Sequence, residues 1–402
     1  MNRTSPLPRP GRRGRATSVM WLWASPEASH ALRSRNLGVI PRAYRWINRL
    51  SQERLAALLG YDKTYISMIE TRRRVISDVA TLRHIAHTLA IPVHVLGVSE
   101  PDDATYKAMV QFADSILNLA DIARQAGRAT DAIAELWPLV ARLEARAAEG
   151  IADRDTLALL GRARVALGIA LGTVLPEEKL SAAARWTGLA LLIAQRLDQP
   201  AALAHALAMH GNELRKAGHL PAAVTRLRAA VATSTEIPAR VAACAMLARA
   251  AGEAGHAELF DTSIDAYRRL LDQANNQGDC QPDGSGMFDN PFTLREIQLR
   301  GLVGTGRASA AVQLMTHSHD NVPAAPQWAV IEHVTTGQAL LAIGDHQSAQ
   351  HALSTAITRA ETHQLPHQIQ RAVRLAGDLL PGTTDQGRAA LVRLNQQLTR
   401  LP

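Results

Sequence analysis

The sequence is poor in aromatic residues and almost devoid of cysteine. Aromatic residues make up 4% of the 402 residues, and Val and Ile are sparse beside Ala, Leu and Arg, which favours helix over sheet. The two cysteines, Cys244 and Cys280, cannot build a disulfide framework or a cysteine-based zinc module, and they fit a reducing cytosol. The longest apolar run near the N-terminus, residues 19–24, is too short for a signal-peptide core or a membrane span. These shortages exclude the secreted, membrane and all-β classes and predict a cytoplasmic all-α protein.

Positive charge is concentrated in the first quarter of the chain. The formal net charge is +8, and residues 1–49 hold ten arginines against one acidic residue, Glu27. Residues 50–100 add one net positive charge, so the rest of the chain carries a net charge of −2. A basic end on a near-neutral body suggests that this end meets a polyanion. The alternative is a solvated tail whose arginines bind nothing.

Composition and helical patterning divide the chain into five parts. Residues 1–34 lack a helical period and are rich in Pro, Gly, Ser and Arg, which predicts a disordered basic extension, with Met20 as a second candidate start. The parts that follow are a helix-turn-helix domain over residues 35–98, a linker over 99–104, a helical array over 105–385 and a C-terminal helix or tail over 386–402. Within the array, residues 275–291 contain four Gly or Pro residues before the final proline and predict a loop insertion.

Local signals in the first domain predict two short helices joined by a tight turn. Ser51 can cap the first helix, and Gly60 can end it in a left-handed conformation. Asp62 can cap the second helix. A further helix is expected to begin at its cap Ser77 and to end before Pro92. Two short helices joined by a turn that contains glycine form the pattern of a DNA-binding helix-turn-helix.

The residues that carry this motif form a distinctive string of about sixty residues. They are Leu50-Ser51-Gln52-Glu53-Arg54-Leu55-Ala56, Leu59-Gly60, Tyr65-Ile66-Ser67-Met68-Ile69-Glu70, Thr81-Leu82, Ala86, Leu89 and Ile91-Pro92-Val93. The string resembles the Xre/lambda-repressor-like helix-turn-helix family. The resemblance implies a small five-helix domain whose first helix lies at about residues 37–48. Two residues depart from the family pattern: Pro41, which is tolerable only in the first turn of that helix, and Arg49, which replaces a glycine.

The resemblance also implies which side chains meet DNA. The second helix of such a motif enters the major groove, with its N-terminal residues at the base edges, while arginines that follow it bind phosphates and fix the position of the protein. The expected DNA-binding residues are Gln52, Lys63, Thr64, Ser67, Arg72, Arg73 and Arg74. Gln52 would bind a phosphate or brace a base-reading side chain. The neighbouring Tyr65, Ile66 and Ile69 are expected to be partly or wholly in the core.

A second pattern recurs downstream: a glycine, an alanine five residues later and an apolar residue four further on. It occurs at Gly127/Ala132/Leu136, Gly218/Ala223/Leu227, Gly306/Ala311/Met315 and Gly344/Ala349/Leu353. Two of these copies add a small residue, Ala230 and Ala356, and an upstream glycine, Gly211 and Gly337. Gly255 marks a further, degenerate copy. Such spacings predict helical hairpins, in which glycine closes the first helix and small residues let paired helices approach.

This pattern resembles tetratricopeptide repeats, most clearly at residues 342–349. The resemblance implies an α-solenoid of helical hairpins with a concave groove for a peptide, a small molecule or a protein partner. By repeat position, the groove is expected to be lined by Asn212, Arg215, Lys216, Arg249 and Gln338. The alternatives are an unrelated helical bundle and, for these five residues, ordinary surface exposure.

No motif predicts an enzyme, a cofactor or a metal site. The glycines of residues 301–309 resemble a phosphate-binding loop, but Arg307 stands where that motif needs Lys, and a helix-like segment rather than a strand precedes them. The run His317-Ser318-His319-Asp320 has no spaced partner cluster and predicts a loop rather than a metal site.

Together these features predict a sequence-specific transcriptional regulator that binds double-stranded DNA, senses an effector through its helical repeats and forms a homodimer. The layout resembles that of regulators with tetratricopeptide sensor domains in Gram-positive bacteria, some of which respond to peptides. The high Arg and Ala content is typical of a GC-rich actinobacterial genome. The alternative function is an interaction scaffold whose helix-turn-helix domain no longer reads DNA, which the departures at Pro41 and Arg49 favour.

Overall fold

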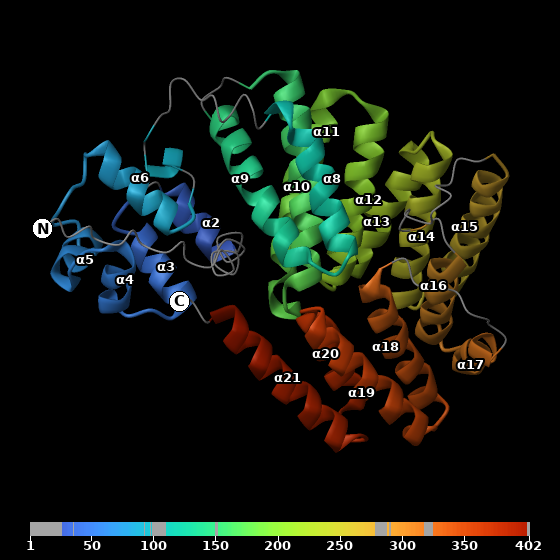
Figure 1. Cartoon of the computed structure of the whole chain (residues 1–402). Helices are drawn as coiled ribbons and strands as arrows, with labels where there is room; N and C mark the ends of the chain where they lie inside the picture. Colours follow the sequence, from blue (N-terminus) through green and yellow to red (C-terminus); the bar gives the residue numbers. More distant parts are fainter. Residues whose placement is uncertain are drawn as a thin grey trace, which may run out of the picture. The chain divides into compact units, whose positions relative to one another are not determined.

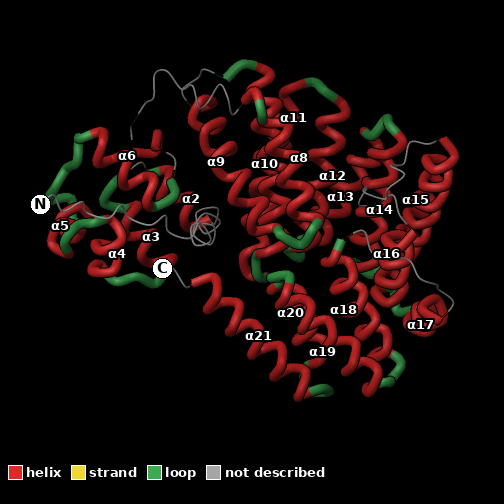
Figure 2. Tube along the Cα trace, viewed as in Figure 1, coloured by secondary structure: helices red, strands yellow, loops and turns green. Residues whose placement is uncertain are grey.

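The computed structural model describes residues 26–399, apart from residues 35, 92, 97, 99–109, 149–151, 278–287, 289–290 and 317–324. The chain divides into two compact units, unit 1 with residues 1–99 and 397–402 and unit 2 with residues 100–396. Every regular element among the described residues is a helix (Figure 2), which confirms the all-α class. The predicted linker, residues 99–104, lies outside the described residues.

Over its described residues, unit 1 is a small bundle of five α-helices and one 3-10 helix. The elements are α2 (Pro26–Arg33), α3 (Ile40–Asn48), α4 (Gln52–Leu59), α5 (Lys63–Glu70), α6 (Val79–Thr88) and η2 (Val93–Leu96). Each helix contributes apolar side chains to one core, among them Ile40, Tyr44, Leu55, Ile66 and Ile85. Burial raises the pKa of the Tyr44 phenol to about 12. The predicted small helical domain is confirmed: four of these α-helices and η2 lie within the predicted residues 35–98, and α2 precedes them.

The helix ends of the motif are set by the residues that the sequence predicts, with one exception. The Ser51 hydroxyl accepts a hydrogen bond from the Arg54 amide at 3.1 Å, and Asp62 accepts one from the Tyr65 amide at 2.7 Å. Gly60 ends α4 with a φ of +73°. The prediction that Ser77 caps α6 is wrong: the cap is Asp78, whose carboxylate accepts from the Thr81 amide.

The predicted disorder of residues 1–34 is wrong for its last part. Residues 26–33 form α2, which packs on α3. Ala28 and Ala31 are both buried, and two small apolar residues three positions apart are enough to hold one short helix against a neighbour. Residues 1–25 lie outside the described residues.

The two departures from the family pattern leave the helices of unit 1 intact. Helix α3 begins at Ile40, three residues later than predicted, so Pro41 lies in the first turn, where no backbone donor is lost. Arg49 ends α3 in the left-handed conformation, with a φ of +54°. A non-glycine residue pays about 1 kcal/mol or more for that conformation, but its amide still caps the helix.

Unit 2 is a stack of seven helical hairpins over its described residues (Figure 1). Their first helices are α8 (Ala113–Gln125), α10 (Arg154–Val174), α12 (Pro200–Lys216), α14 (Ile237–Glu253), α16 (Pro291–Gly304), α18 (Pro326–Ala342) and α20 (Pro366–Ala376). Their second helices are α9 (Ala129–Ala148), α11 (Leu180–Leu197), α13 (Leu220–Thr233), α15 (Ala257–Gln277), α17 (Ala308–Thr316), α19 (His346–Thr362) and α21 (Pro381–Thr399). Each first helix contacts the next first helix along the chain, as in an α-solenoid.

The recurring glycines lie at the turns of these hairpins, as predicted. All five, from Gly127 to Gly344, have φ values of +72° to +84°, a conformation that costs glycine nothing. Gly211 and Gly337 act differently, since they face the second helix of their own hairpins. A Cβ on either would lie 2.6 Å from the Cγ of Leu227 or Leu353, so only glycine allows the two helices to lie so close.

Two predicted boundaries of the array are wrong. Helix α15 continues to Gln277, three residues into the predicted loop, and the rest of that loop, apart from Phe288 and the start of α16, lies outside the described residues. The boundary at residue 385 does not exist, because α21 is one helix and its Ala390 and Leu394 are buried in the same core as Ile369. That burial holds the last hairpin in the stack.

The stack bends back on itself, so that α20 contacts α10 and the 3-10 helix η3 (Glu177–Lys179). The side-chain oxygen of Gln370 accepts a hydrogen bond from the Glu177 amide at 2.8 Å, and its nitrogen donates to Glu178 at 2.9 Å. Arg374 pairs with the Glu177 carboxylate. Helix α10 is the one described helix long and apolar enough to cross a membrane, but 56% of that stretch is buried inside unit 2.

Candidate functional site

The first candidate site is the outer face of α5. Lys63 and Thr64 at its N-terminus are exposed, and Ser67 is half-buried. Residues three and four positions apart share one face of a helix, so these three polar side chains form a single surface. Ile66 and Ile69 are buried and Tyr65 is half-buried, which confirms their predicted place in or near the core.

A buried carboxylate at the end of α5 fixes this helix to the rest of unit 1. Glu70 accepts two hydrogen bonds from the Arg45 guanidinium, at 2.6 and 2.8 Å, and one from the Gln52 amide at 2.8 Å. Arg42 donates to the Glu70 carbonyl at 2.7 Å. Burial acts to raise the pKa of Glu70, but the hydrogen bonds from Arg45 and Gln52 hold it below its usual value. Glu70 thus joins α3, α4 and α5 at one point.

This arrangement changes the roles expected of three residues. Gln52 braces Glu70 rather than a base-reading side chain, and it uses one of the two N–H groups of its amide for that bond. Arg42 and Arg45 belong to the arginine-rich N-terminal quarter, but both bind Glu70. The sequence analysis missed this brace, because Arg45 and Glu70 are 25 residues apart.

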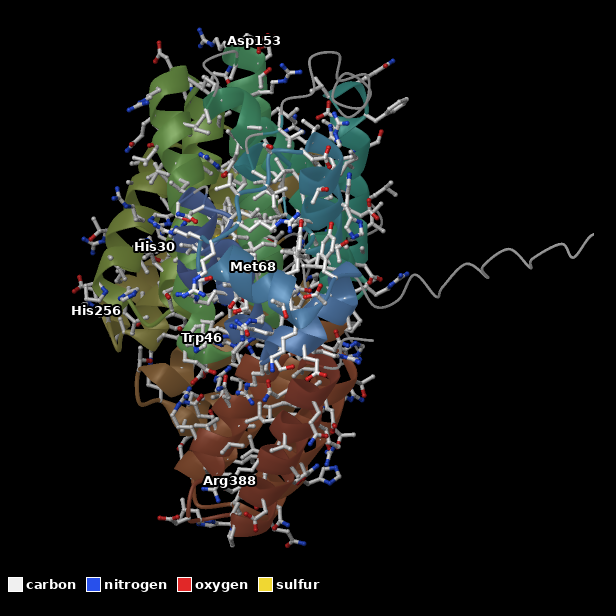
Figure 3. The ribbon with its side chains drawn as sticks, turned by 90° about the vertical axis from the view of Figure 1, so that its left-hand side faces the viewer. His30, Trp46, Met68, Asp153, His256 and Arg388 are labelled. Carbon is white, nitrogen blue, oxygen red and sulfur yellow. The ribbon has the colours of Figure 1, made fainter. Side chains whose placement is uncertain are left out.

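Arg72, Arg73 and Arg74 are all exposed just after α5. Arg72 has a φ of +62°, which ends the helix and turns the chain. The Arg74 guanidinium lies over the Tyr65 ring at 4.5 Å from its centroid, and that ring stacks on Tyr61. A cation–π contact uses the face of the guanidinium and leaves its N–H groups free to bind an anion. Figure 3 shows the side chains on unit 1, including the exposed indole of Trp46 on α3.

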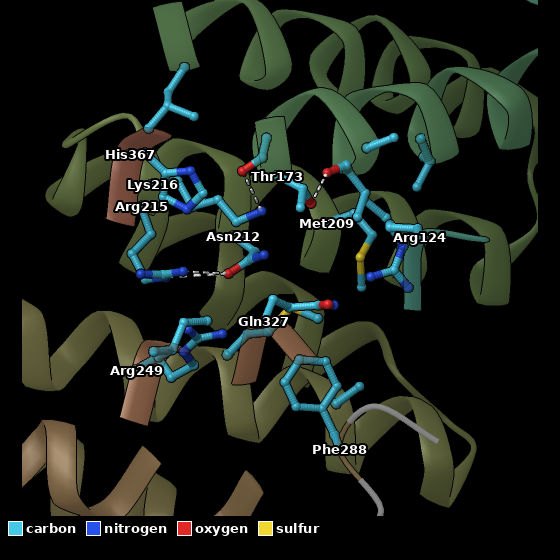
Figure 4. Close-up of a pocket in the computed structure, with 18 of the residues that line it drawn as sticks. Arg124, Thr173, Met209, Asn212, Arg215, Lys216, Arg249, Phe288, Gln327 and His367 are labelled. Carbon is cyan, nitrogen blue, oxygen red and sulfur yellow. Dashed lines mark hydrogen bonds between the residues drawn. The ribbon is translucent and has the colours of Figure 1, made fainter. Parts of the chain in front are cut away.

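The second candidate site is a cavity of about 1690 Å³ in unit 2. The first helices of all seven hairpins contribute to its lining, with single residues of α9, α11, α13 and η3 and with Phe288. Figure 4 shows some of the lining residues, among them Arg124, Arg249 and Phe288. All five residues expected to line a groove reach it: Asn212, Arg215, Lys216, Arg249 and Gln338. Ordinary surface exposure, the alternative for these residues, is wrong for Asn212, Arg215 and Arg249, which are buried.

The polar lining follows one repeat position. Counted along the sequence, the residue six positions before each turn glycine lines the cavity in six of the seven hairpins. These residues are Asp121, Asn212, Arg249, Arg300, Gln338 and Arg371. Two of them, Arg300 and Arg371, are functional candidates that the sequence analysis missed, although the same offset from Gly306 and Gly377 points to them. The regularity shows that the hairpins present equivalent positions to one shared cavity.

Eight charged residues form what we call the central charge cluster. They are the basic residues Arg215, Lys216, Arg249, Arg300 and Arg371 and the acidic residues Glu213, Glu253 and Glu296, from α12, α14, α16 and α20. Ion pairs link most of them: the Glu253 carboxylate accepts a hydrogen bond from Arg215 at 2.6 Å and another from Arg300 at 2.9 Å. Lys216 pairs with Glu213 at 2.8 Å, and Arg300 also pairs with Glu296 at 3.1 Å. The cluster has five cations and three anions, so positive charge is in excess.

This excess of positive charge, together with burial, shifts the pKa values of the ionisable groups in the cavity. Burial acts to raise the pKa of Glu253, but Arg215 and Arg300 bring it down to about 2. Burial, with Arg300 next to it, lowers the pKa of Arg371 to about 9. Burial and the nearby Lys216 lower the pKa of His367 to about 3, so this imidazole is neutral at pH 7. The site disfavours further positive charge.

Arg249 stands apart from the rest of the cluster. It is buried, and no described residue forms a hydrogen bond or an ion pair with its guanidinium; Nε is fully enclosed without a partner. Its one specific contact is with the Trp328 ring, whose centroid lies 5.0 Å away. Burial, followed by Arg215 and Arg300, lowers the pKa of Arg249 well below its usual value. Buried atoms of Gln327, His367 and Gln368 also lack a partner among the described residues.

Neither motif rejected from the sequence forms a site among the described residues. The glycines of 301–309 belong to the end of α16 and the hairpin turn at Gly306. Arg307, in the place of the required Lys, binds Asp261 at 2.9 and 3.1 Å. The run His317 to Asp320 lies outside the described residues. No group of three His, Cys, Asp or Glu residues in the described part of the chain could hold a metal ion.

Comparisons with known proteins give a likeness in structure alone. No protein-family model matches the chain, and no curated protein matches it. Among solved structures, it is similar to PlcR of Bacillus thuringiensis in complex with the peptide PapR7 and DNA, at 12% identity over 90% of this chain and 96% of that chain, with a TM-score of 0.23. It is also similar to a circular tandem repeat protein with a novel repeat topology, at 14% identity over 96% of both chains, with a TM-score of 0.24. At these TM-scores, neither likeness says what this chain binds.

Proposed function

We propose that the protein is a sequence-specific DNA-binding transcriptional regulator and that the cavity of unit 2 is its effector site. The observation that carries the first half is the exposed polar face of α5, which Glu70 holds rigidly on α3 and α4. A helix that enters the major groove needs such a face at its N-terminus. Arg72, Arg73 and Arg74 supply exposed positive charge directly beside it, as phosphate binding requires.

The alternative function, an interaction scaffold without DNA binding, rested on Pro41 and Arg49. Both residues are accommodated: Pro41 lies in the first turn of α3, and Arg49 ends that helix. Neither residue disturbs α4 or α5, so the departures from the family pattern do not favour loss of DNA binding.

The proposal predicts how base-reading side chains behave. Lys63→Ala or Ser67→Ala should cost about 1–3 kcal/mol at the preferred operator, because a hydrogen bond to a base edge is lost. Binding to random DNA of the same length should change little. Fluorescence anisotropy on an operator selected from a random pool measures both affinities. Equal losses on operator and random DNA would show that these side chains touch only the backbone, and no selected operator at all would reject the proposal.

We further propose that the regulator is a homodimer, because one helix-turn-helix buries little surface and two copies can read half-sites roughly 10 bp apart. Unit 2 offers an apolar surface for this contact. Phe112 precedes the first residue of α8, and Leu119 lies within α8 seven residues later. Their side chains are 58% and 62% exposed. Light scattering should show a dimer for the full chain and a monomer for the double variant Phe112→Ser/Leu119→Ser. If the double variant is still a dimer, the contact lies elsewhere on the chain. If the wild-type protein is a monomer, the proposed homodimer is wrong.

An effector acts on DNA binding only if it distinguishes between conformations of the protein. The cavity is suited to this, because all seven first helices line it. A ligand that fills it touches every hairpin of unit 2 and can change the curvature of the stack.

A further inference from the structure

We propose that the effector is an organic anion, whose carboxylate or phosphate group pairs with Arg249 and Arg371 inside the cavity and whose apolar body lies along the cavity wall. This inference rests on the proposed effector site and names the chemical class that fits it. It does not depend on DNA binding by unit 1.

The first argument is the charge balance of the central charge cluster. Its three carboxylates form ion pairs with other cations of the cluster: Glu213 with Lys216, Glu253 with Arg215 and Arg300, and Glu296 with Arg300. One oxygen of Glu213 and one of Glu296 are buried without a hydrogen-bond partner among the described residues. Among the described residues, no ion pair joins a carboxylate to Arg249 or Arg371, and the five cations of the cluster exceed its three anions by two. A buried cation without a counter-anion destabilises the folded protein, and such a cation is expected where a ligand supplies the counter-anion. The two missing negative charges are supplied by a ligand.

The second argument is the geometry of these two arginines. Arg371 uses one side of its guanidinium to donate to Gln338 at 2.9 Å, while its Nη1 is buried without a partner. Arg249 uses none of its donors among the described residues. Both arginines interact electrostatically with Arg300, Glu253 and Glu296, so they belong to one locus. Guanidinium groups with free N–H pairs match the oxygens of a carboxylate or phosphate.

The third argument is the apolar wall beside the charges. The Trp328 ring contacts the Arg249 guanidinium, and Trp328 lines the cavity together with the apolar side chains of Met209, Met246 and Ile169. Figure 4 shows Met209 and Phe288 in the same cavity as Arg249. The volume of about 1690 Å³ exceeds the ~300–1,000 Å³ of ordinary small-molecule pockets. An extended anion with an apolar body fits this combination, whereas a small inorganic ion would leave the wall uncovered.

Other charges at the cavity are already paired and do not compete for this role. Arg124 binds Asp121, Arg162 binds Asp114, and Arg374 binds Glu177. Gln327 and Gln368 each have a side-chain oxygen that is buried without a partner among the described residues.

Calorimetric titration of the full chain, without DNA, tests the proposal with three matched probes: octanoate, octyl phosphate and neutral octanamide. At least one of the two acids should bind about tenfold or more tightly than the amide, at equal ionic strength. Tighter binding of octanoate than of octyl phosphate would identify the acid group of the effector as a carboxylate. Tighter binding of octyl phosphate would identify it as a phosphate ester. Arg249→Met and Arg371→Met should each remove that preference, while Arg388→Met on α21, where Arg388 is 69% exposed, should leave it unchanged.

A thermal melt without ligand gives a second readout that keeps the variants interpretable. If Arg249 has no counter-charge until an anion binds, Arg249→Met should raise the Tm of the ligand-free protein by about 2–4 °C. The substitution replaces an unpaired buried charge by an apolar side chain of similar length. A lower Tm would show that Arg249 is structural and would overturn the proposal, as would equal affinity for acid and amide. Either result would leave the Lys63 test of DNA binding untouched, so failure of this inference is distinct from failure of the proposed function.

Discussion

Replacing Glu253 by Gln is expected to lower the free energy of unfolding of unit 2 by about 3–5 kcal/mol. Arg215 and Arg300 both pair with this carboxylate, and their side chains are 5% and 6% exposed. Without Glu253, Arg215 stays buried with no ion pair and Arg300 keeps only its pair with Glu296. Breaking a buried ion pair from one side costs about this much. The excess of positive charge in the central charge cluster would also increase.

The effect of this substitution should depend on pH. The pKa of Glu253 is about 2 in the folded protein and 4.5 in the unfolded chain, so folding favours its charged form. Its contribution is fully present above pH 4.5 and is lost as the pH falls from 4.5 towards 2. Scanning calorimetry should therefore show a gap between wild type and Glu253→Gln that closes over this range. Glu135→Gln, on the exposed face of α9, should match wild type throughout; a gap that does not depend on pH would contradict the assignment.

Replacing Arg72, Arg73 and Arg74 together by Ala should weaken DNA binding by about 100-fold at 0.15 M salt. Each phosphate contact contributes a slope of about 0.9 to the dependence of log affinity on log salt, so three contacts contribute about 2.7. Operator and random DNA should lose affinity alike, because phosphates carry no sequence information. Binding measured from 50 to 300 mM salt gives both the loss and the change in slope.

A matched triple variant separates local contact from net charge. Arg226, Arg228 and Arg240 are exposed residues of unit 2 outside the cavity lining, and changing them to Ala removes the same charge from the chain. This control should retain the affinity and the salt slope of wild type. If both triple variants lose affinity equally, general attraction rather than contact at α5 holds the DNA.

Local signals were sufficient for most of the fold because each depends on near neighbours. Ser51, Asp62 and the turn glycines act through backbone groups within a few residues, and these positions were predicted correctly. Where two adjacent candidates compete, as Ser77 and Asp78 do, the pattern cannot decide which one caps. Helix α2 was missed because the buried side chains described in it, Ala28 and Ala31, are small and give only a weak apolar period.

The candidate sites were predictable only in part. Repeat position predicted Asn212, Arg249 and Gln338. Arg371 was missed because it precedes a turn at Gly377, which lacks the downstream alanine of the four clear copies. The charge balance of the cavity could not be read from the sequence, because ion pairs such as Arg215 with Glu253 and Arg300 with Glu253 join different hairpins. The Glu70 brace has the same origin, since its partners come from α3 and α4.

Chromatin immunoprecipitation with sequencing tests the central claim, that this chain reads specific DNA sites through α5, most directly. The wild-type protein and Lys63→Ala would be compared at equal expression in the native host. The proposal predicts discrete sites that share one sequence motif for wild type, and weak or absent enrichment at those sites for Lys63→Ala. No discrete site for wild type, or an unchanged set of sites for the variant, would contradict it.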